Sequence, residues 1–276
     1  MNRIEVESMN ILVCIKQVPD TTEIKIDPEK HTLIRDGVPS IVNTFDTYAL
    51  EMACRLKEET GGSVTVMTMG LPQAKKALKS CLGAGADRAV LISDRPFGGS
   101  DTLATSYIIS QAVACLEKEN GSAFDLILCG KQAIDGDTAQ VGPELSEHLG
   151  RPLVTYVSEL KYEEGEFQGK RENDDGYDWI GVKAPCVMTV VKTAYEPRYP
   201  TLKAKIEAEW AEIRTITAES MKETLDLSKC GLKGSPTKVV RTTTPENKVK
   251  CIYIKEASPA LSAGKLADML AQKKVI

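Results

Sequence analysis

An alternation of short apolar runs with amphipathic segments constrains the fold more than any other feature of this sequence. Four apolar runs have the length of buried strands, at residues 10–16, 64–69, 89–92 and 124–129. The segments between them are long enough to cross back over a sheet, and parallel strands require such crossovers. The alternation therefore predicts an α/β fold with a parallel sheet. Since such crossovers are right-handed, a doubly wound sheet is the simplest topology.

The connecting segments carry the signals of helices. Apolar residues recur at helical spacing from Phe45 onward, and Pro72 suits the first turn of a second helix. Ser100 or Asp101 is suited to cap the N-terminus of a third helix, and Gly150 suits the C-terminal end of a fourth. The first half of the chain therefore predicts strands and helices in strict alternation.

Beyond residue 151 the pattern changes to short strands separated by turn residues. Strand-length segments lie at residues 154–162, 167–170, 179–182 and 187–191, and we expect them to add antiparallel strands to the sheet. A polar stretch near the N-terminus, residues 24–34, suits a small surface hairpin.

The tail from Glu219 onward is polar, rich in lysine and weakly periodic. One possible helix face in it has too few apolar neighbours to become buried, and carries Leu261, Leu266, Met269 and Leu270. We therefore divide the chain into an N-terminal extension (1–9), an α/β domain (10–218) and a C-terminal arm (219–276) that packs on a partner.

Composition argues against several functional classes. The net charge of -4 and pI near 5.5 are not those of a general nucleic-acid binder, and no apolar run approaches the roughly 18 residues of a membrane-spanning helix. The eight cysteines include no CxxC pair, so we expect buried thiols in a reducing compartment and no metal site. The first residues lack the apolar core of a signal peptide. These features predict a cytoplasmic protein without membrane insertion.

The most informative segment, GKQAIDGDTAQVGP at residues 130–143, directly follows the fourth predicted strand. Ligands of open parallel sheets bind beyond the carboxyl ends of the strands, where a helix N-terminus offers N–H groups to phosphate. The segment offers flexible glycines, a cation and neutral donors at Gly130, Gly136, Lys131, Thr138 and Gln140. It suits a phosphate-binding loop, and equally an ordinary loop with Asp137 as the helix cap. The sequence has no GxGxxG motif, P-loop or nucleophile elbow.

The GKQAID run at residues 130–135, followed by Asp137, resembles the nucleotide loop of the beta subunits of electron transfer flavoproteins. Three other segments agree with that family in order, namely LVCIKQVPD at residues 12–20, GADR at 85–88 and EPRYPTL at 196–202. The resemblance spans about residues 10–213. It implies a Rossmann-like domain that binds an adenine nucleotide, in a heterodimer with an alpha subunit that carries the electron-transferring FAD.

By position, the resemblance implies nucleotide contacts on the strand ends, on two helix starts and on the loop. These residues are Cys14, Asn43, Thr44, Phe45, Met69, Gly70, Asp101, Thr102, Thr105, Gly130, Lys131, Gln132, Ala133, Ile134, Asp135, Gly136, Asp137, Thr138, Ala139, Gln140 and Val141. Other roles stay open for some of them. Phe45 and Met69 suit a core position, and Asp101 and Thr102 suit a helix cap. No side chain is expected to act as a general acid or base.

Three segments, at residues 18–21, 100–105 and 135–138, resemble the electron-bifurcating members of the family. That resemblance implies an FAD in this chain that takes hydride from NADH. One electron then goes to ferredoxin or flavodoxin, and the other passes through the alpha-subunit FAD to a flavoenzyme of the acyl-CoA dehydrogenase type. The alternative is a non-bifurcating electron shuttle, in which this chain holds structural AMP.

A loop stiffened by two prolines corresponds to the family's docking loop for its dehydrogenase. The expected docking residues are Glu196, Pro197, Arg198, Tyr199 and Leu202. In the alternative interpretation, Leu202 begins an amphipathic helix with Ile206 and Trp210 and packs inward. A third functional class, a regulatory nucleotide-binding domain like the universal stress proteins, would require neither this loop nor the arm.

Overall fold

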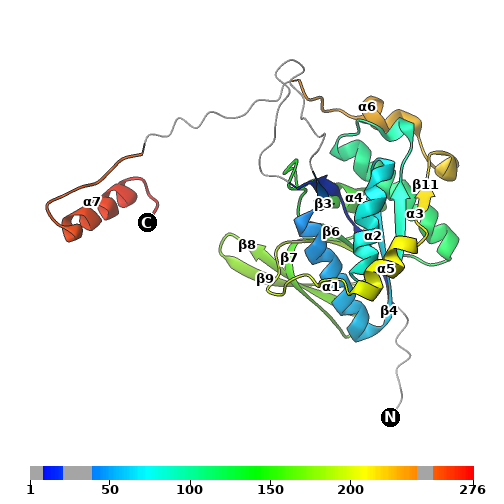
Figure 1. Cartoon of the computed structure of the whole chain (residues 1–276), viewed down its shortest axis with the longest axis horizontal. Helices are drawn as coiled ribbons and strands as arrows, with labels where there is room; N and C mark the ends of the chain where they lie inside the picture. Colours follow the sequence, from blue (N-terminus) through cyan, green and yellow to red (C-terminus); the bar gives the residue numbers. More distant parts are fainter. Residues whose placement is uncertain (1–8, 21–38, 241–250) are drawn as a thin grey trace, which may run out of the picture. The chain divides into compact units, whose positions relative to one another are not determined.

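The computed structural model describes residues 9–20, 39–240 and 251–276 (Figure 1). These residues belong to two compact units, the first ending at Val240 and the second containing residues 251–276. The hairpin expected at residues 24–34 lies outside the described residues. The first unit contains the sheet and the candidate site.

The first unit is built on a nine-stranded sheet with the order β11-β5-β4-β1-β6-β10-β7-β8-β9. The strand bounds are β1 (Met9–Cys14), β4 (Gly62–Met69), β5 (Arg88–Ile92), β6 (Leu126–Gly130), β7 (Leu153–Glu163), β8 (Glu166–Asn173), β9 (Gly176–Val182), β10 (Cys186–Val190) and β11 (Arg214–Ile216). A separate antiparallel pair consists of β2 (Gln17–Pro19) and β3 (Ser40–Val42). The four strands that the apolar runs predict are all present, and they pair in parallel.

Helices cover both faces of this sheet, as the doubly wound fold requires. Their bounds are α1 (Thr44–Thr60), α2 (Lys75–Gly83), α3 (Thr102–Asn120), α4 (Val141–Leu149), α5 (Leu202–Trp210) and α6 (Gly231–Gly234). Alternate residues of β1 serve the two faces: Ile11 and Val13 pack with α1 and α2, while Leu12 packs with α3 and α4. Strand β1 therefore contributes to both cores, because successive side chains of a strand point to opposite faces of the sheet.

The expectation of antiparallel additions holds for β8, which pairs antiparallel to β7, and for β9, which pairs antiparallel to β8. Both strands lie to one side of the helical layers (Figure 1). It is wrong for β10, and for β7 it holds only on the side that pairs with β8. Strand β10 inserts beside β6 in parallel, and β7 pairs in parallel with β10. All five residues of β10 are buried. Burial on both faces is typical of a central parallel strand, and it explains why four of the five residues of this segment are apolar.

Residues 219–240, which the sequence assigns to the arm, are part of the first unit. Short 3₁₀ turns at Glu219–Met221 and Leu227–Lys229 precede α6. Met221 and Cys230 are buried in the core that contains α3. The described part of the second unit holds one helix, α7 (Pro259–Gln272), none of whose residues is buried.

Candidate functional site

The sheet order creates a crevice at one edge, between β1 and β6. From β1 the chain winds through β4 and β5 on one side, then crosses back to β6 on the other side of β1. Neighbouring connections leave the sheet in opposite directions at such a switch point, which is where open α/β sheets bind ligands. The loop that follows β6 therefore lies where the sequence places it.

A cavity of about 380 Å³ occupies this crevice. Most of the expected contact residues line it, namely Cys14, Asn43, Met69, Asp101, Thr102, Thr105, Gly130, Lys131, Gln132, Ala133, Gly136, Thr138, Ala139, Gln140 and Val141. Seven lining residues were not predicted: Ile15, Lys16, Asp46, Ser100, Ile109, Cys129 and Gly142. The sequence could have identified Lys16 and Cys129 as lining residues, since each lies at the carboxyl end of a predicted strand.

The wall of the cavity at the strand ends is neutral and largely apolar. Cys14 and Cys129 are partners in the parallel register of β1 and β6, and both thiols are buried. The hydrogen bond with Cys14, together with burial, raises the pKa of the Cys129 thiol well above its ordinary value. Cys129 is therefore uncharged at neutral pH, as expected for a buried thiol.

Asn43 fixes the loop after β6 to the start of α1. Its side chain is 1% exposed, and its Nδ2 donates to Asp46 Oδ1 at 2.9 Å and to the Gln132 carbonyl at 2.8 Å. Its Oδ1 accepts from Ile134 N at 3.0 Å. All hydrogen-bonding atoms of this buried amide therefore have partners, and two of the three partners belong to the loop.

Asp46 extends this network to β1 and β6. Its carboxylate accepts from Lys16 N at 2.6 Å and from Gly130 N at 3.1 Å, in addition to Asn43. Burial raises the pKa of Asp46 to about 7, although these hydrogen bonds lower it. A Cβ atom on Gly130 would lie 2.2 Å from Asp46 Oδ1, so only glycine fits there. We refer to Asn43 and Asp46 together as the Asn43–Asp46 clamp.

The loop itself is held by one ion pair and one side-chain hydrogen bond, and two of its residues have positive φ values. Lys16 Nζ lies 2.6 Å from Asp135 Oδ1, and Gln132 Nε2 donates to Asp137 Oδ1 at 2.7 Å. Asp137 and Ala139 have positive φ values of 51° and 54°. Gly136 has no positive φ, and a Cβ atom there would have no neighbour within 4 Å. Glycine is therefore not required by the backbone conformation at this position, and the missing side chain leaves open space beside the cavity.

The side chain of Asp101 caps α3, as the alternative interpretation of this residue proposed. Oδ1 accepts from Ala104 N at 3.0 Å, and Oδ2 accepts from both the amide and the hydroxyl of Thr237. Thr102 Oγ1 donates to Glu144 Oε1 at 3.1 Å, which links α3 to α4. Both residues nevertheless line the cavity.

Six of the expected contact residues lie outside the cavity lining. Asp135, Ile134 and Asp137 hold the loop through the contacts given above. Gly70 donates its N–H to the Ile92 carbonyl at 3.0 Å. The other two, Thr44 and Phe45, lie in the first turn of α1.

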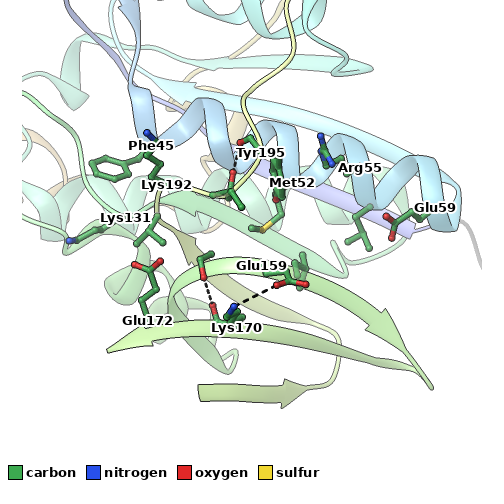
Figure 2. Close-up of a pocket in the computed structure, with 16 residues that line it drawn as sticks. Phe45, Met52, Arg55, Glu59, Lys131, Glu159, Lys170, Glu172, Lys192 and Tyr195 are labelled. Atoms are coloured by element: carbon green, nitrogen blue, oxygen red, sulfur yellow. Dashed lines mark hydrogen bonds and ion pairs between the residues drawn. The ribbon is translucent and has the colours of Figure 1, made fainter. Parts of the chain in front are cut away.

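Phe45 lines a second, larger cavity of about 990 Å³ between α1 and the β7–β8 hairpin. Figure 2 shows Arg55 on the α1 side and Glu159 beside Lys170 on the hairpin side. Acidic and basic residues are mixed in its lining, so it has no single charge preference. Lys131 lines both cavities.

The expected docking loop has an internal anchor and an exposed end. Arg198 Nε lies 2.7 Å from Glu51 Oε2, and Arg198 also pairs with Glu58, so this residue fixes the loop to α1. Burial raises the pKa of Glu51, but hydrogen bonds from Arg198 and Arg55 hold it below its ordinary value. Tyr199 is 95% exposed and Leu202 is 75% exposed.

The inward-packing alternative for Leu202 is wrong for the described chain. Helix α5 begins at Leu202, with Thr201 as its N-cap. Its apolar residues Ile206 and Trp210 are 54% and 85% exposed. Ala208 is the residue of α5 that is buried.

Comparison with known proteins agrees with this architecture. The electron transfer flavoprotein domain matches residues 30–221. The chain is 49% identical over 240 residues to the electron transfer flavoprotein subunit beta of Clostridium acetobutylicum, covering 87% of this chain and 90% of that protein. It is 45% identical over 269 residues to the caffeyl-CoA reductase-Etf complex subunit CarD of Acetobacterium woodii, covering 97% and 100%.

The acryloyl-CoA reductase electron transfer subunit gamma of Anaerotignum propionicum is 43% identical to this chain over 272 residues, covering 97% of this chain and all of that protein. Among the residues that the structure describes, no helix has the length and apolar character needed to cross a bilayer. With its matching domain, its fold and its identity to these proteins over nearly its whole length, this chain belongs to the electron transfer flavoprotein family as a beta subunit.

Proposed function

We propose that this beta subunit holds FAD in the cavity between β1 and β6, and that this FAD takes hydride from NADH. In this proposal one electron goes to ferredoxin or flavodoxin. The other passes through the FAD of an alpha subunit to a flavoenzyme of the acyl-CoA dehydrogenase type. Two relatives support an acyl-CoA pathway, since their names connect them to caffeyl-CoA and acryloyl-CoA reductases.

The single observation that carries the proposal is the clamped loop at the switch point of the sheet. The cavity volume of about 380 Å³ falls within the usual range of ligand sites. Lys131 supplies a cation, and Thr138 and Gln140 supply neutral donors to the lining. The open space beside Gly136 lets phosphate oxygens approach the backbone. These residues fit a phosphate-bearing adenine nucleotide.

When bound, the flavin supplies the chemistry of hydride transfer and of single-electron transfer. The chain's own residues bind and orient it. The Asn43–Asp46 clamp fixes the loop before the ligand arrives, so little ordering is required on binding. Cys14, Cys129 and Met69 form a neutral wall that excludes water. None of these roles requires a side chain to transfer a proton.

The alternative function is an electron shuttle in which this cavity holds structural AMP. The same loop and the same exposed residues, Tyr199 and Leu202, serve both functions. In either case the part of the arm that contains α7 packs on the alpha subunit. The exposed apolar residues of α7, such as Leu261, support that expectation.

The nucleotides released from the purified complex with its alpha subunit distinguish the two functions. Two FAD molecules per heterodimer support the proposal, whereas one FAD and one AMP exclude bifurcation by this chain. In the Gly136→Val variant we expect one flavin to be lost and NADH-dependent reduction of ferredoxin to stop, because a β-branched side chain fills the open space. Gly136→Ala is the graded control and should lose less flavin. Two flavins retained in Gly136→Val would show that Gly136 is not at the phosphates.

A further inference from the structure

The segment after the second 3₁₀ turn of the tail returns to the N-terminus of α3. Gly231 N donates to Ser100 Oγ at 3.1 Å, and Asp101 N donates to Ser235 Oγ at 2.8 Å. Thr237 donates to Asp101 Oδ2 through its amide at 3.0 Å and its hydroxyl at 2.8 Å. We call residues 230–237 the strap. Thr237 and Asp101, which these bonds join, are 136 residues apart in the sequence.

The strap is closely seated against the turn before α3. Gly231 has a φ of 59°, and a Cβ atom there would lie 2.3 Å from the Pro96 carbonyl oxygen. A Cβ atom on Gly99 would lie 2.7 Å from the side chain of Leu232. Only glycine allows these two backbone segments to approach so closely. The strap therefore has a defined position at the start of α3.

Asp101 is the point where the strap meets the candidate nucleotide cavity. Oδ1 is used by Ala104 N and Oδ2 by Thr237, so both carboxylate oxygens point to partners within the chain. Asp101 is also one of the residues that line the cavity. Burial raises the pKa of Asp101, but hydrogen bonds from Ala104, Thr237 and Ser235 hold it below its ordinary value. A negative charge is thus held in one orientation at the rim.

That orientation matters for any ligand that carries phosphate. A carboxylate that turned into the cavity would repel an anionic ligand and would leave the N-terminus of α3 without its cap. The Thr237 hydroxyl and amide oppose this movement by holding Oδ2. Ser235 holds the backbone of the same residue.

We propose that Ser235 and Thr237 are positioning residues of the candidate nucleotide site, which hold the Asp101 carboxylate on the α3 N-terminus and away from the phosphates of the ligand. This inference rests on the proposed nucleotide binding, with either FAD or AMP as the ligand. It assigns a function to a segment that the sequence alone places in the arm.

The test measures binding of AMP and of FAD by calorimetry to the nucleotide-depleted complex of the full-length chain with its alpha subunit. Thr237→Val removes one charge-assisted hydrogen bond and keeps the side-chain shape. We expect affinity to fall about tenfold, the equivalent of roughly 1.4 kcal/mol. Thr237→Ser keeps the hydroxyl and should bind within about twofold of the wild type. Thr217→Val is the matched control, because the Thr217 hydroxyl contacts only Ser220 in a surface turn among the described residues.

Two further measurements separate positioning from loss of stability. The defect of Thr237→Val should be larger at low ionic strength, since it arises from a charge. Adding Asp101→Asn, which keeps a capping residue without the charge, should restore affinity in the Thr237→Val background.

The inference is overturned if Thr237→Val binds as the wild type does. It is also overturned if Thr237→Ser is equally weak or if Asp101→Asn restores nothing. A wild-type complex that binds neither AMP nor FAD refutes the proposed function, and this inference with it.

Discussion

Removing the Asn43 side chain tests the Asn43–Asp46 clamp directly. Asn43→Ala deletes three hydrogen bonds of 2.8 to 3.0 Å from a residue that is 1% exposed. At about 1 kcal/mol for each bond, the loss of unfolding free energy is about 3 kcal/mol. For a domain of this size we expect the melting temperature to fall by roughly 6 to 12 °C. The freed loop should also hold nucleotide less tightly.

The assay compares thermal unfolding and nucleotide content of the complex for the wild type and for Asn43→Ala. Asn10→Ala is the matched control, because the Asn10 side chain makes one exposed hydrogen bond of 3.4 Å to the Ala123 carbonyl. We expect a change within about 0.5 kcal/mol for the control. If Asn43→Ala unfolds like the control and retains its nucleotide, the clamp does not hold the loop.

Three further predictions concern Asp46 of the clamp and two other sites in the first unit. Burial raises the pKa of Asp46 in the folded state to about 7 from an ordinary value of 3.8, so the folded state binds more protons between these two pH values. Its contribution to stability should be complete below pH 3.8 and lost as the pH rises through about 7, and Asp46→Asn should remove this slope from unfolding free energies measured against pH. Leu202→Ala should weaken electron delivery at limiting dehydrogenase about tenfold without changing flavin content. The control Leu71→Ala, at a leucine that is 65% exposed, should not weaken it, and equal rates for the two variants would exclude Leu202 as the anchor. Arg151→Ala removes the Nη2 group that donates to both oxygens of the mostly buried Glu117 carboxylate, and should cost about 3 kcal/mol in denaturant unfolding. A loss below about 1 kcal/mol would contradict burial of the pair.

The parallel core was predictable because its signals are local. A short apolar run defines β6, and the glycine cap that ends α4 lies next to that helix, with Gly150 in the left-handed conformation. Whether β10 pairs in parallel or antiparallel was harder to predict, since a run of five buried residues suits either arrangement until the neighbouring strands are known. Its apolar character, which only Thr189 interrupts, was the available signal.

The contacts that shape the site depend on residues far apart in the sequence. Asn43 stands at the N-cap position of α1, where asparagine usually caps the helix, yet its side chain makes no cap hydrogen bond. It bonds instead to the Gln132 carbonyl, 89 residues away. Asp101 and Thr237 are separated by 136 residues. Local patterns identify such residues as polar and well placed, but only the folded topology identifies their partners.

The exposure of α5 determines what the intrinsic fluorescence of this chain reports. The chain has two tryptophans, Trp179 and Trp210, which are 44% and 85% exposed. Indole emission depends on contact with solvent, so the folded subunit should already emit at long wavelength and unfolding should shift its spectrum little. A protein that covers α5 would instead move the Trp210 emission toward shorter wavelength. In the Trp179→Phe variant Trp210 is the single tryptophan, so its emission reports on the α5 surface without a label.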